Sequence, residues 1–263
     1  MDRIDDVLGY KNLKIYQNSS YFSFSLDSIV LANYATIRLR DRSIVDFCTG
    51  NGVVPLILSR RTSNKIIGVE LQEKIAKLAK DSVSYNNLDN QIEIFCEDIK
   101  DFSKKNSDSF DLVLCNPPYF KVTEGTQFNI SYEKMVARHE VFITLSDLCA
   151  CAKKILKDHG NFCLIHRSDR LMDILIELKK NNIEPKKIKF IYETIEKESF
   201  LVLIEGQKCG KTGLKIEKPL ILYNKDGSIT DEYKLLQEEV RVWYKKVMMD
   251  KRLYILFQRL LEI

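Results

Sequence analysis

The residues best suited to chemistry are Asn116, Pro117, Pro118 and Tyr119, directly after the apolar run 112–115. Two consecutive prolines fix two φ angles and remove two backbone donors, so nearby carbonyl oxygens must find partners elsewhere. The side-chain oxygen of Asn116 and the carbonyl oxygen of Pro117 can each accept one hydrogen of an aromatic amine and direct its lone pair toward an electrophile. The motif predicts N-alkylation of an exocyclic amine, with Tyr119 stacked on the base. The alternative is an ordinary strand-ending turn.

Three acidic residues, Asp46, Glu70 and Asp98, follow apolar runs, and Gly50 and Gly52 lie in a turn after the first run. Glycines let the backbone pass close to a ligand, and acids at strand ends accept hydrogen bonds from ammonium, hydroxyl and amine groups. The turn lacks the full dinucleotide-binding glycine spacing and no P-loop lysine is present, which disfavours a dinucleotide or ATP. The pattern predicts a nucleoside cofactor, S-adenosylmethionine. Alternatively, Glu70 and Asp98 are solvated acids that cap helices.

Alternating strand and helix patterns must position these residues, and they predict an α/β fold with a doubly wound, mostly parallel sheet. The seven predicted strands are 43–48, 65–70, 91–97, 110–116, 161–166, 188–193 and 200–205. The predicted helices are 26–38, 55–61, 72–87, 140–157 and 169–181. Because no helix separates the last two strands, we expect one antiparallel strand there.

Several stretches of the chain resemble the class I, S-adenosylmethionine-dependent amino-methyltransferases. DFCTGNG is similar to the family's glycine loop, with Cys48 where a glycine is usual, and NPPY matches without change. FSFSLDSIVLANYA, ARHE, IHRSDRL and GLKIEKPLILYNKDGSIT resemble the bacterial tRNA (adenine-N6) methyltransferases that modify the adenosine just 3′ of the anticodon in a valine tRNA. The resemblance implies a Rossmann-like, seven-stranded sheet with one antiparallel strand.

The resemblance also implies roles for individual residues. Ser25 to Asp27 would lie over the methionine part of the cofactor, while Asp46, Glu70 and Asp98 would hold its amino-acid end, ribose and adenine. Asn116 would lie beside both cofactor and substrate. We therefore expect a cofactor-covering segment at 1–40 and a methyltransferase domain at 41–236. A basic helical extension is expected at 237–263, beyond the stretches that carry the resemblance.

The NPPY motif also fits adenine in DNA and a glutamine amide in release factors. DNA enzymes that read a sequence generally carry a target-recognition domain, for which no segment is long enough. The glutamine enzymes usually carry an N-terminal helical domain, and only residues 1–42 precede the first predicted strand. A non-catalytic subunit that holds the cofactor and binds RNA is a further alternative, although it need not keep an amine pocket. The predicted partner is tRNA.

The excess positive charge lies at the end of the chain. Residues 241–263 hold six basic and two acidic side chains, a net +4 that equals the formal charge of the whole chain. This concentration of positive charge makes residues 241–263 the first candidate for binding a polyanion. The candidates for tRNA contact are Arg241, Lys245, Lys246, Lys251 and Arg252 in this stretch, with Arg138 and His139 earlier in the chain. Alternatively, the stretch packs as an amphipathic helix, and Arg138 pairs with Glu140.

Composition excludes several other protein classes. With 263 residues, 45% apolar and 30% charged, the chain can bury a sizeable core. No run approaches the roughly 18 apolar residues of a membrane helix, and the N-terminal sequence is acidic and polar, unlike a signal peptide. Seven scattered cysteines fit a reduced compartment, and the three histidines are not at metal-ligand spacing. We expect a cytoplasmic protein without a metal or a membrane partner.

Overall fold

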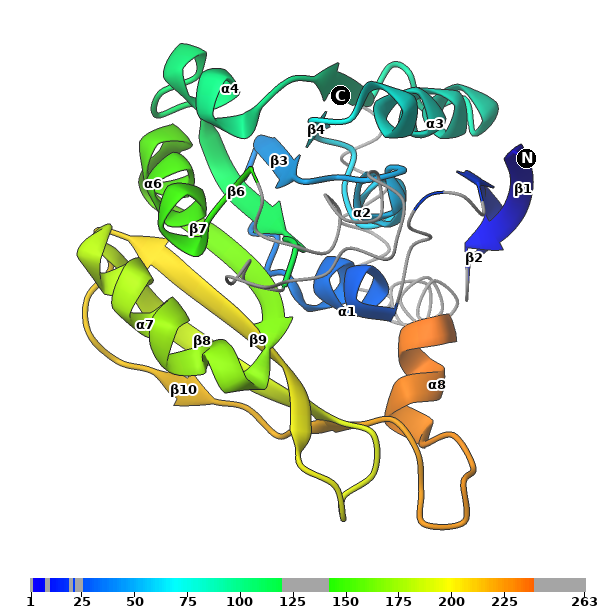
Figure 1. Cartoon of the computed structure of the whole chain (residues 1–263), viewed down its shortest axis with the longest axis vertical. Helices are drawn as coiled ribbons and strands as arrows, with labels where there is room; N and C mark the ends of the chain where they lie inside the picture. The colour runs from blue at the N-terminus through cyan, green and yellow to red at the C-terminus, as the bar shows by residue number, and fades with distance from the viewer. Residues whose placement is uncertain (1, 8–9, 19–20, 22–25, 120–141, 239–263) are drawn as a thin grey trace, which may run out of the picture.

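The computed structural model describes residues 2–7, 10–18, 21, 26–119 and 142–238. Within these ranges a nine-stranded sheet has the order β10-β8-β9-β7-β6-β3-β4-β5, and β11 also pairs with β8 (Figure 1). The strands are β3 (Ser43–Phe47), β4 (Lys65–Glu70), β5 (Ile92–Cys96), β6 (Phe110–Cys115), β7 (Leu156–Arg167), β8 (Ile183–Tyr192), β9 (Ser199–Lys208), β10 (Lys215–Ile216) and β11 (Leu220–Ile221).

All seven predicted strands are present, and the predicted antiparallel strand is β9, which runs opposite to both β7 and β8. The two additional strands, β10 and β11, have only two residues each and pair in parallel with β8. Such short strands carry no apolar alternation, so a sequence pattern cannot reveal them.

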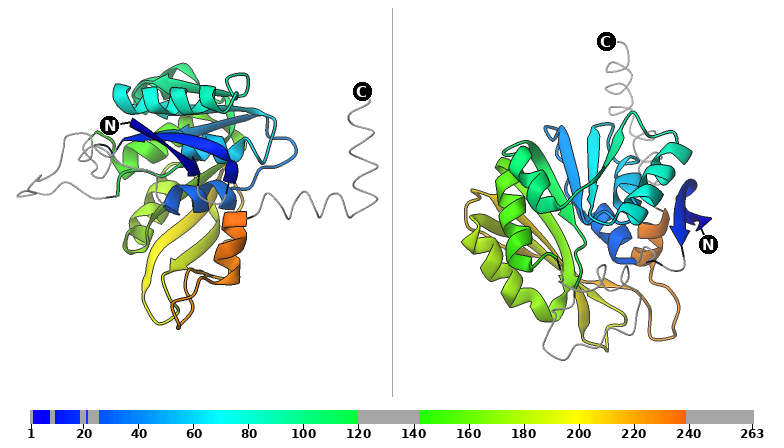
Figure 2. Two further views of the ribbon diagram at one scale, coloured as in Figure 1. Left: turned by 90° about the vertical axis from the view of Figure 1, so that its right-hand side faces the viewer. Right: turned by 45° about the horizontal axis from the view of Figure 1, so that its top comes forward.

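Helices cover both faces of the sheet, and each face has its own apolar cluster (Figure 2). One cluster includes α1 (Leu26–Tyr34), α2 (Val53–Leu58) and α3 (Glu73–Tyr85); α8 (Asp231–Glu238) packs at its margin. The other cluster includes α4 (Ile99–Lys105), α6 (Leu145–Ile155) and α7 (Leu171–Lys180). A sheet buried on both faces explains why its central strands β3, β4 and β6 are mostly apolar.

Local rules set the helix boundaries. Helix α6 begins later than its predicted start at residue 140, because Thr144 and Asp147 form a capping box. It ends at Ile155, and the next residue, Leu156, already belongs to β7. Helix α4 was not predicted, since its seven residues show too little periodicity, although Asp98 caps its first turn.

The N-terminal segment contains a hairpin that was not predicted, formed by β1 (Asp2–Val7) and β2 (Tyr10–Asn18). Strand β2 lies against α3: the Tyr16 N–H donates to Ser82 Oγ at 2.9 Å, and the Lys14 N–H donates to Asn86 Oδ1 at 3.0 Å. Leu13 and Ile15 on β2 are fully buried. The hairpin is therefore packed against the main domain through β2.

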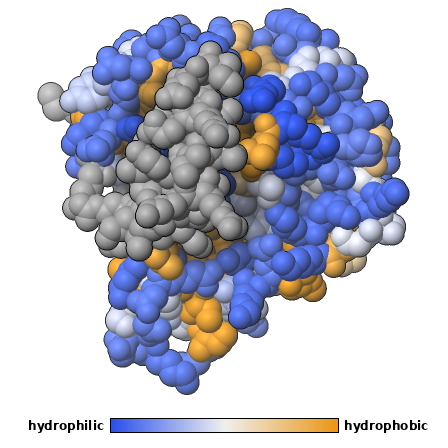
Figure 3. Space-filling model, turned by 180° about the vertical axis from the view of Figure 1, so that it is seen from behind, coloured by the Kyte–Doolittle hydropathy of each residue, from blue (hydrophilic) through white to orange (hydrophobic). Residues whose placement is uncertain are grey.

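The outer surface is mostly hydrophilic on the side seen in Figure 3, with small, separate hydrophobic areas. Isolated exposed apolar side chains are normal for a globular protein. Within the described ranges, none of the helices combines the length and the apolar character needed to cross a membrane.

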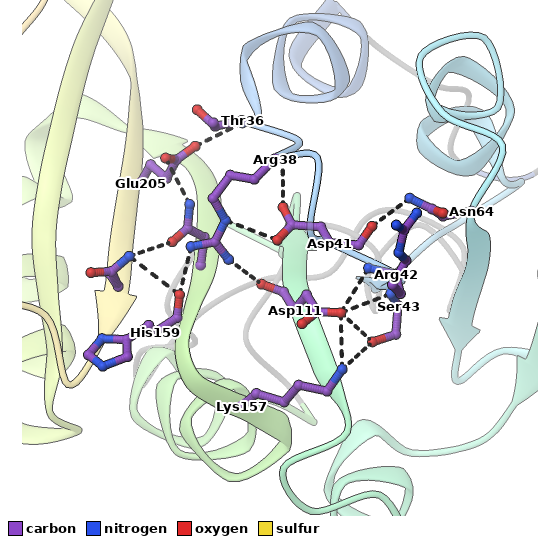
Figure 4. Close-up of polar contacts among 12 residues, drawn as sticks. Thr36, Arg38, Asp41, Arg42, Ser43, Asn64, Asp111, Lys157, His159 and Glu205 are labelled. Carbon is purple, nitrogen blue, oxygen red and sulfur yellow. Dashed lines mark hydrogen bonds and ion pairs between the residues drawn. The ribbon is translucent and has the colours of Figure 1, made fainter. Parts of the chain in front are cut away.

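A network of ion pairs and hydrogen bonds joins the amino-terminal ends of β3 and β6 to the loop after α1 (Figure 4). The fully buried Asp41 accepts from the Arg38 guanidinium at 2.9 Å and from the Arg38 N–H at 2.7 Å. Asp111 accepts from the Arg42 N–H at 2.9 Å and pairs with the Lys157 ammonium at 3.1 Å. Each of these carboxylates therefore has a cationic partner.

Candidate active site

The carboxyl ends of β3, β4 and β6 meet at one edge of the sheet and enclose a cavity of about 200 Å³. This volume is several times the ~30 Å³ share of one water molecule, so the cavity suits a ligand. The predicted residues that line it are Asp27, Asp46, Gly50, Glu70, Asp98, Asn116, Pro117, Pro118 and Tyr119. The structure thus brings both predicted groups, the acids and the NPPY corner, to one site.

The turn between β3 and α2 adopts left-handed backbone conformations, with φ of 55° at Cys48, 58° at Gly50 and 88° at Gly52. Nothing lies within 4 Å of a Cβ built on Gly50, so this position opens toward the cavity. Cys48 also lines the cavity. Its positive φ explains why a glycine suits this position, since a left-handed non-glycine residue costs roughly 1–2 kcal/mol.

Gly52 was predicted to bind the cofactor, but it is not among the described residues that line the cavity. It precedes the first residue of α2, and a Cβ at this position would lie 3.3 Å from Ala79 Cβ on α3. The close approach of Gly52 to Ala79 together with the left-handed φ explains the glycine. Its predicted contact with the cofactor stays a prediction.

Asp46 at the end of β3 is almost completely buried, with 1% of its surface exposed. Its Oδ2 accepts from Thr49 Oγ1 at 2.6 Å, whereas its Oδ1 has no hydrogen-bond partner. Burial raises the pKa of Asp46 to about 8, and the nearby Glu70 charge adds to this, while the Thr49 hydrogen bond opposes it. A buried acceptor without a donor is destabilising unless a ligand satisfies it.

Glu70 at the end of β4 is also buried, at 7% exposure, which excludes the alternative of a solvated acid. Its two oxygens accept from the Gly50 N–H at 3.0 Å and the Gln72 N–H at 2.9 Å. Burial raises the pKa of Glu70, although the backbone hydrogen bonds lower it in part. Each carboxylate oxygen has a further lone pair for a ligand hydroxyl.

Asp98 combines both interpretations that the sequence allows. It is the N-cap of α4, where its side chain accepts from the Lys100 N–H at 2.8 Å, and it lies 3.6 Å from the Lys100 ammonium. It also lines the cavity. Capping engages one oxygen, so Asp98 retains acceptor capacity for a ligand.

The side chains of the NPPY corner contact helix α1. Asn116 Nδ2 donates to Ser28 Oγ at 3.0 Å. The Tyr119 hydroxyl lies 2.6 Å from Asp27 Oδ2 and 2.5 Å from Asn116 Oδ1. Burial raises the pKa of Tyr119 far above its usual value, with a further contribution from the Asp27 charge. The Asn116 oxygen that was predicted to accept from a substrate amine is thus engaged by Tyr119 here.

His166 at the end of β7 packs beside Tyr119, with the two rings tilted and their centroids 5.0 Å apart. Its Nδ1 accepts from the Arg167 N–H at 2.8 Å, and burial lowers the pKa of His166 to about 4. The imidazole is therefore neutral near pH 7, and Nε2 carries its proton. This geometry fits a buried strand-end histidine that supports the Tyr119 ring.

The amino-acid sequence matches a family model. The model for the methyltransferase small domain covers residues 24–184, more than half of the sequence. The chain belongs to the methyltransferase small domain family. The match includes the glycine turn, all three predicted acids and the NPPY corner. This methyltransferase is therefore an enzyme of the predicted class.

Curated relatives of this methyltransferase match over most of their length. A tRNA1(Val) (adenine(37)-N6)-methyltransferase of Bacteroides fragilis is 24% identical over 232 residues, covering 81% of this chain and 96% of the relative. The protein of the same name from Proteus mirabilis is 23% identical over 242 residues, covering 89% of this chain and 93% of the relative.

Solved structures share the fold of this methyltransferase. A predicted O-methyltransferase from Agrobacterium tumefaciens has a TM-score of 0.63 at 17% identity and covers 82% of this chain and 97% of that one. Pyrococcus horikoshii TYW2 in complex with MeSAdo has a TM-score of 0.55 at 14% identity, and the match covers 80% of this chain and 72% of that one. The predicted Rossmann-like class I methyltransferase fold is confirmed.

Sequence reasoning missed several lining residues of this methyltransferase, notably Ser28, Thr49 and the pair Phe142 and Ile143. Thr49 has a signal in the sequence, since it lies within the glycine turn three residues after Asp46. Ser28 and the pair have none, because only the fold brings α1 and the start of the segment before α6 to the strand ends.

Other predicted site residues lie outside the described part of the chain: Ser25, Arg138, His139, Arg241, Lys245, Lys246, Lys251 and Arg252. Their predicted contacts with cofactor or tRNA stay predictions.

Proposed function

We propose that this methyltransferase transfers a methyl group from S-adenosylmethionine to N6 of an adenosine next to the anticodon of a tRNA, by resemblance a valine tRNA. The observation that carries the proposal is the NPPY corner at the end of β6, which shares one cavity with Asp46, Glu70 and Gly50. The relatives named tRNA1(Val) (adenine(37)-N6)-methyltransferase support the choice of substrate.

The polar groups of the cavity fit this cofactor. The partnerless Asp46 Oδ1 supplies an acceptor for an ammonium group, and the additional lone pairs of Glu70 suit ribose hydroxyls. Asp98 can accept from an adenine amine. When bound, S-adenosylmethionine supplies an electrophilic methyl group on a sulfonium.

The residues of the corner act on the other reactant. Asn116 Oδ1 and the carbonyl oxygen of Pro117 each accept one hydrogen of the adenine amine, which localises the nitrogen lone pair for attack. Tyr119 stacks on the ring. His166 is neutral and buried, and no strongly basic group is required because the amine proton can leave after transfer.

Purified protein incubated with labelled S-adenosylmethionine and separate pools of total tRNA, duplex DNA and release factor tests the proposal. We expect label in tRNA, and N6-methyladenosine after nuclease digestion and mass spectrometry. Label in release factor alone would assign the glutamine-amide reaction instead. Cofactor binding without transfer to any pool would favour the non-catalytic RNA-binding subunit.

The basic stretch 241–263 is proposed to contact tRNA phosphates. Neutralising its basic residues should weaken tRNA binding and reduce the log–log salt slope by roughly one unit for each lost phosphate contact. An unchanged slope would favour a helix that only packs against the protein.

A further inference from the structure

Two adjacent residues of α1 hold the two polar side chains of the NPPY corner. Asp27 Oδ2 lies 2.6 Å from the Tyr119 hydroxyl, and Ser28 Oγ accepts from Asn116 Nδ2 at 3.0 Å. Ser28 is buried, and Asp27 lines the cavity. About 90 residues separate the partners in the sequence, so the fold alone creates these contacts.

The Tyr119 hydroxyl has more acceptors than protons. It lies within hydrogen-bond distance of both Asp27 Oδ2 and Asn116 Oδ1, at 2.6 and 2.5 Å, yet a phenol carries a single proton. Tyr119 therefore cannot donate fully to both oxygens at once. Asn116 Oδ1 is also the oxygen assigned to the substrate amine, so the Tyr119 hydroxyl and the amine compete for the same hydrogen-bond acceptor.

We propose that Asp27 is a positioning residue, which accepts the hydrogen bond of the Tyr119 hydroxyl and thereby frees the Asn116 oxygen for the substrate amine. A hydrogen bond to a carboxylate is roughly twice as strong as one between neutral groups, so Asp27 is the better of the two acceptors. Ser28 meanwhile holds Asn116 Nδ2, which keeps Oδ1 on the side of Tyr119.

The same contacts fix the ring that stacks on the base. Tyr119 is held at its hydroxyl by Asp27, and its ring packs beside that of His166, with centroids 5.0 Å apart. A ring fixed at both points loses little freedom when the base arrives. This role differs from the cofactor contact that the resemblance implies for Asp27, and it rests on the proposed function.

A double-mutant cycle tests the proposal, because Asp27 acts through the Tyr119 hydroxyl. D27A, Y119F and D27A/Y119F are compared with wild type in methyl transfer to tRNA and in cofactor affinity. D27A should lower kcat roughly 10- to 100-fold, the value of one charge-assisted hydrogen bond. Y119F keeps the ring but removes the hydroxyl and its hydrogen bond to Asp27, so its own rate is the reference for the loss that D27A causes in that background. The double variant should match Y119F.

Two further variants complete the design. D27N keeps an oxygen acceptor and should recover part of the activity that D27A loses. D101A is the matched control: Asp101 lies in the first turn of α4, pairs with Lys104 at 2.7 Å and is not among the described residues that line the cavity. It should leave both transfer and cofactor affinity unchanged.

An equal loss from D27A in the wild-type and Y119F backgrounds would overturn the positioning role. The positioning role would also be overturned if D27A raised the cofactor dissociation constant by as much as it lowered kcat/KM. That result would mean that Asp27 acts by binding the cofactor. Failure of the proposed function has a different result: wild type would methylate release factor and not tRNA. The cycle on the glutamine amide would then still show the coupling.

Discussion

Carboxylates at the two ends of the parallel strands differ in their hydrogen-bond and ion-pair partners. At the amino ends, Asp41 and Asp111 are paired with Arg38 and Lys157 and also accept from backbone N–H groups (Figure 4). At the carboxyl ends, Asp46 is as buried as Asp41 but keeps an oxygen without a partner. Partnered acids stabilise a fold, whereas an unpartnered one weakens it and awaits a ligand.

The pKa shifts follow the same division. For Asp111, burial alone would raise the pKa, but the Arg42 N–H, the Lys157 ammonium and Ser43 together hold it below its usual value. For Asp46, burial dominates and raises the pKa to about 8. Both are aspartates on adjacent parallel strands, so the difference in pKa arises from the deeper burial of Asp46 and from the donors around Asp111.

The largest expected effect contrasts two asparagines, one from each region. N116A should lower kcat by roughly 10²- to 10³-fold while nearly preserving cofactor affinity, because it removes an acceptor for the substrate amine. Asn161, which donates to Glu205 at 3.2 Å, belongs to the partnered region. N161A should lower stability and leave kcat unchanged. Full activity of N116A in single-turnover methylation would remove the mechanism.

The second prediction compares the stability of a partnered and an unpartnered acid. R38A leaves the fully buried Asp41 without its cation and should reduce the free energy of unfolding by about 2–3 kcal/mol. This loss is smaller than that expected for breaking a completely buried ion pair, because Arg38 is partly exposed. D46N should leave the unfolding free energy unchanged or higher and should weaken cofactor binding. Urea denaturation measures both. Equal losses of stability would erase the contrast between the regions.

The third prediction concerns pH and Asp46. Its pKa in the folded chain is about 8, above the usual 3.8, so the folded chain retains a proton that the unfolded chain releases. Without cofactor, this group therefore lowers stability progressively as pH rises from about 4 to 8. An ammonium ligand requires the ionised carboxylate, so its affinity should fall up to tenfold for each pH unit below about 8.

Above pH 8 the α-amino group of the cofactor, with an ordinary pKa of about 7.7–8.0, loses its own proton, so affinity should peak near pH 8. Calorimetric titrations in buffers of different ionisation enthalpy should detect the proton released below the peak. D46N serves as the control, with a flat affinity below pH 8. A flat profile for wild type would contradict the role assigned to Asp46.

The carboxyl-end site was largely predictable, because parallel strands present their last residues at one edge. Asp46, Glu70 and Asn116 each follow an apolar run, so strand ends alone place them together. The inward position of Tyr119 was not predictable. Its partner Asp27 lies 92 residues away, and local patterns carry no information about such a contact.

The amino-end network was not predictable for the same reason. Arg38 and Asp41 are neighbours in sequence, but the carbonyls of His159 and Asp111 that Arg38 also reaches come from distant segments. The hairpin of β1 and β2 could not be predicted because β1 is mostly exposed and charged, so its sequence lacks the alternation of a half-buried strand. Long strands and strand ends are thus readable from sequence, and side-chain partners are not.

The smallest expected effect lies at the rim of the amino-end network. Lys157 pairs with Asp111 at 3.1 Å but is itself 43% exposed, so solvent screens the pair. Asp111 retains the N–H groups of Arg42 and Ser43 and the Ser43 hydroxyl when Lys157 is removed. K157A should therefore reduce the unfolding free energy by less than about 1 kcal/mol, and by less still at high salt. A loss as large as that of R38A, measured by urea denaturation, would mean that the cations rather than the backbone donors hold this region together.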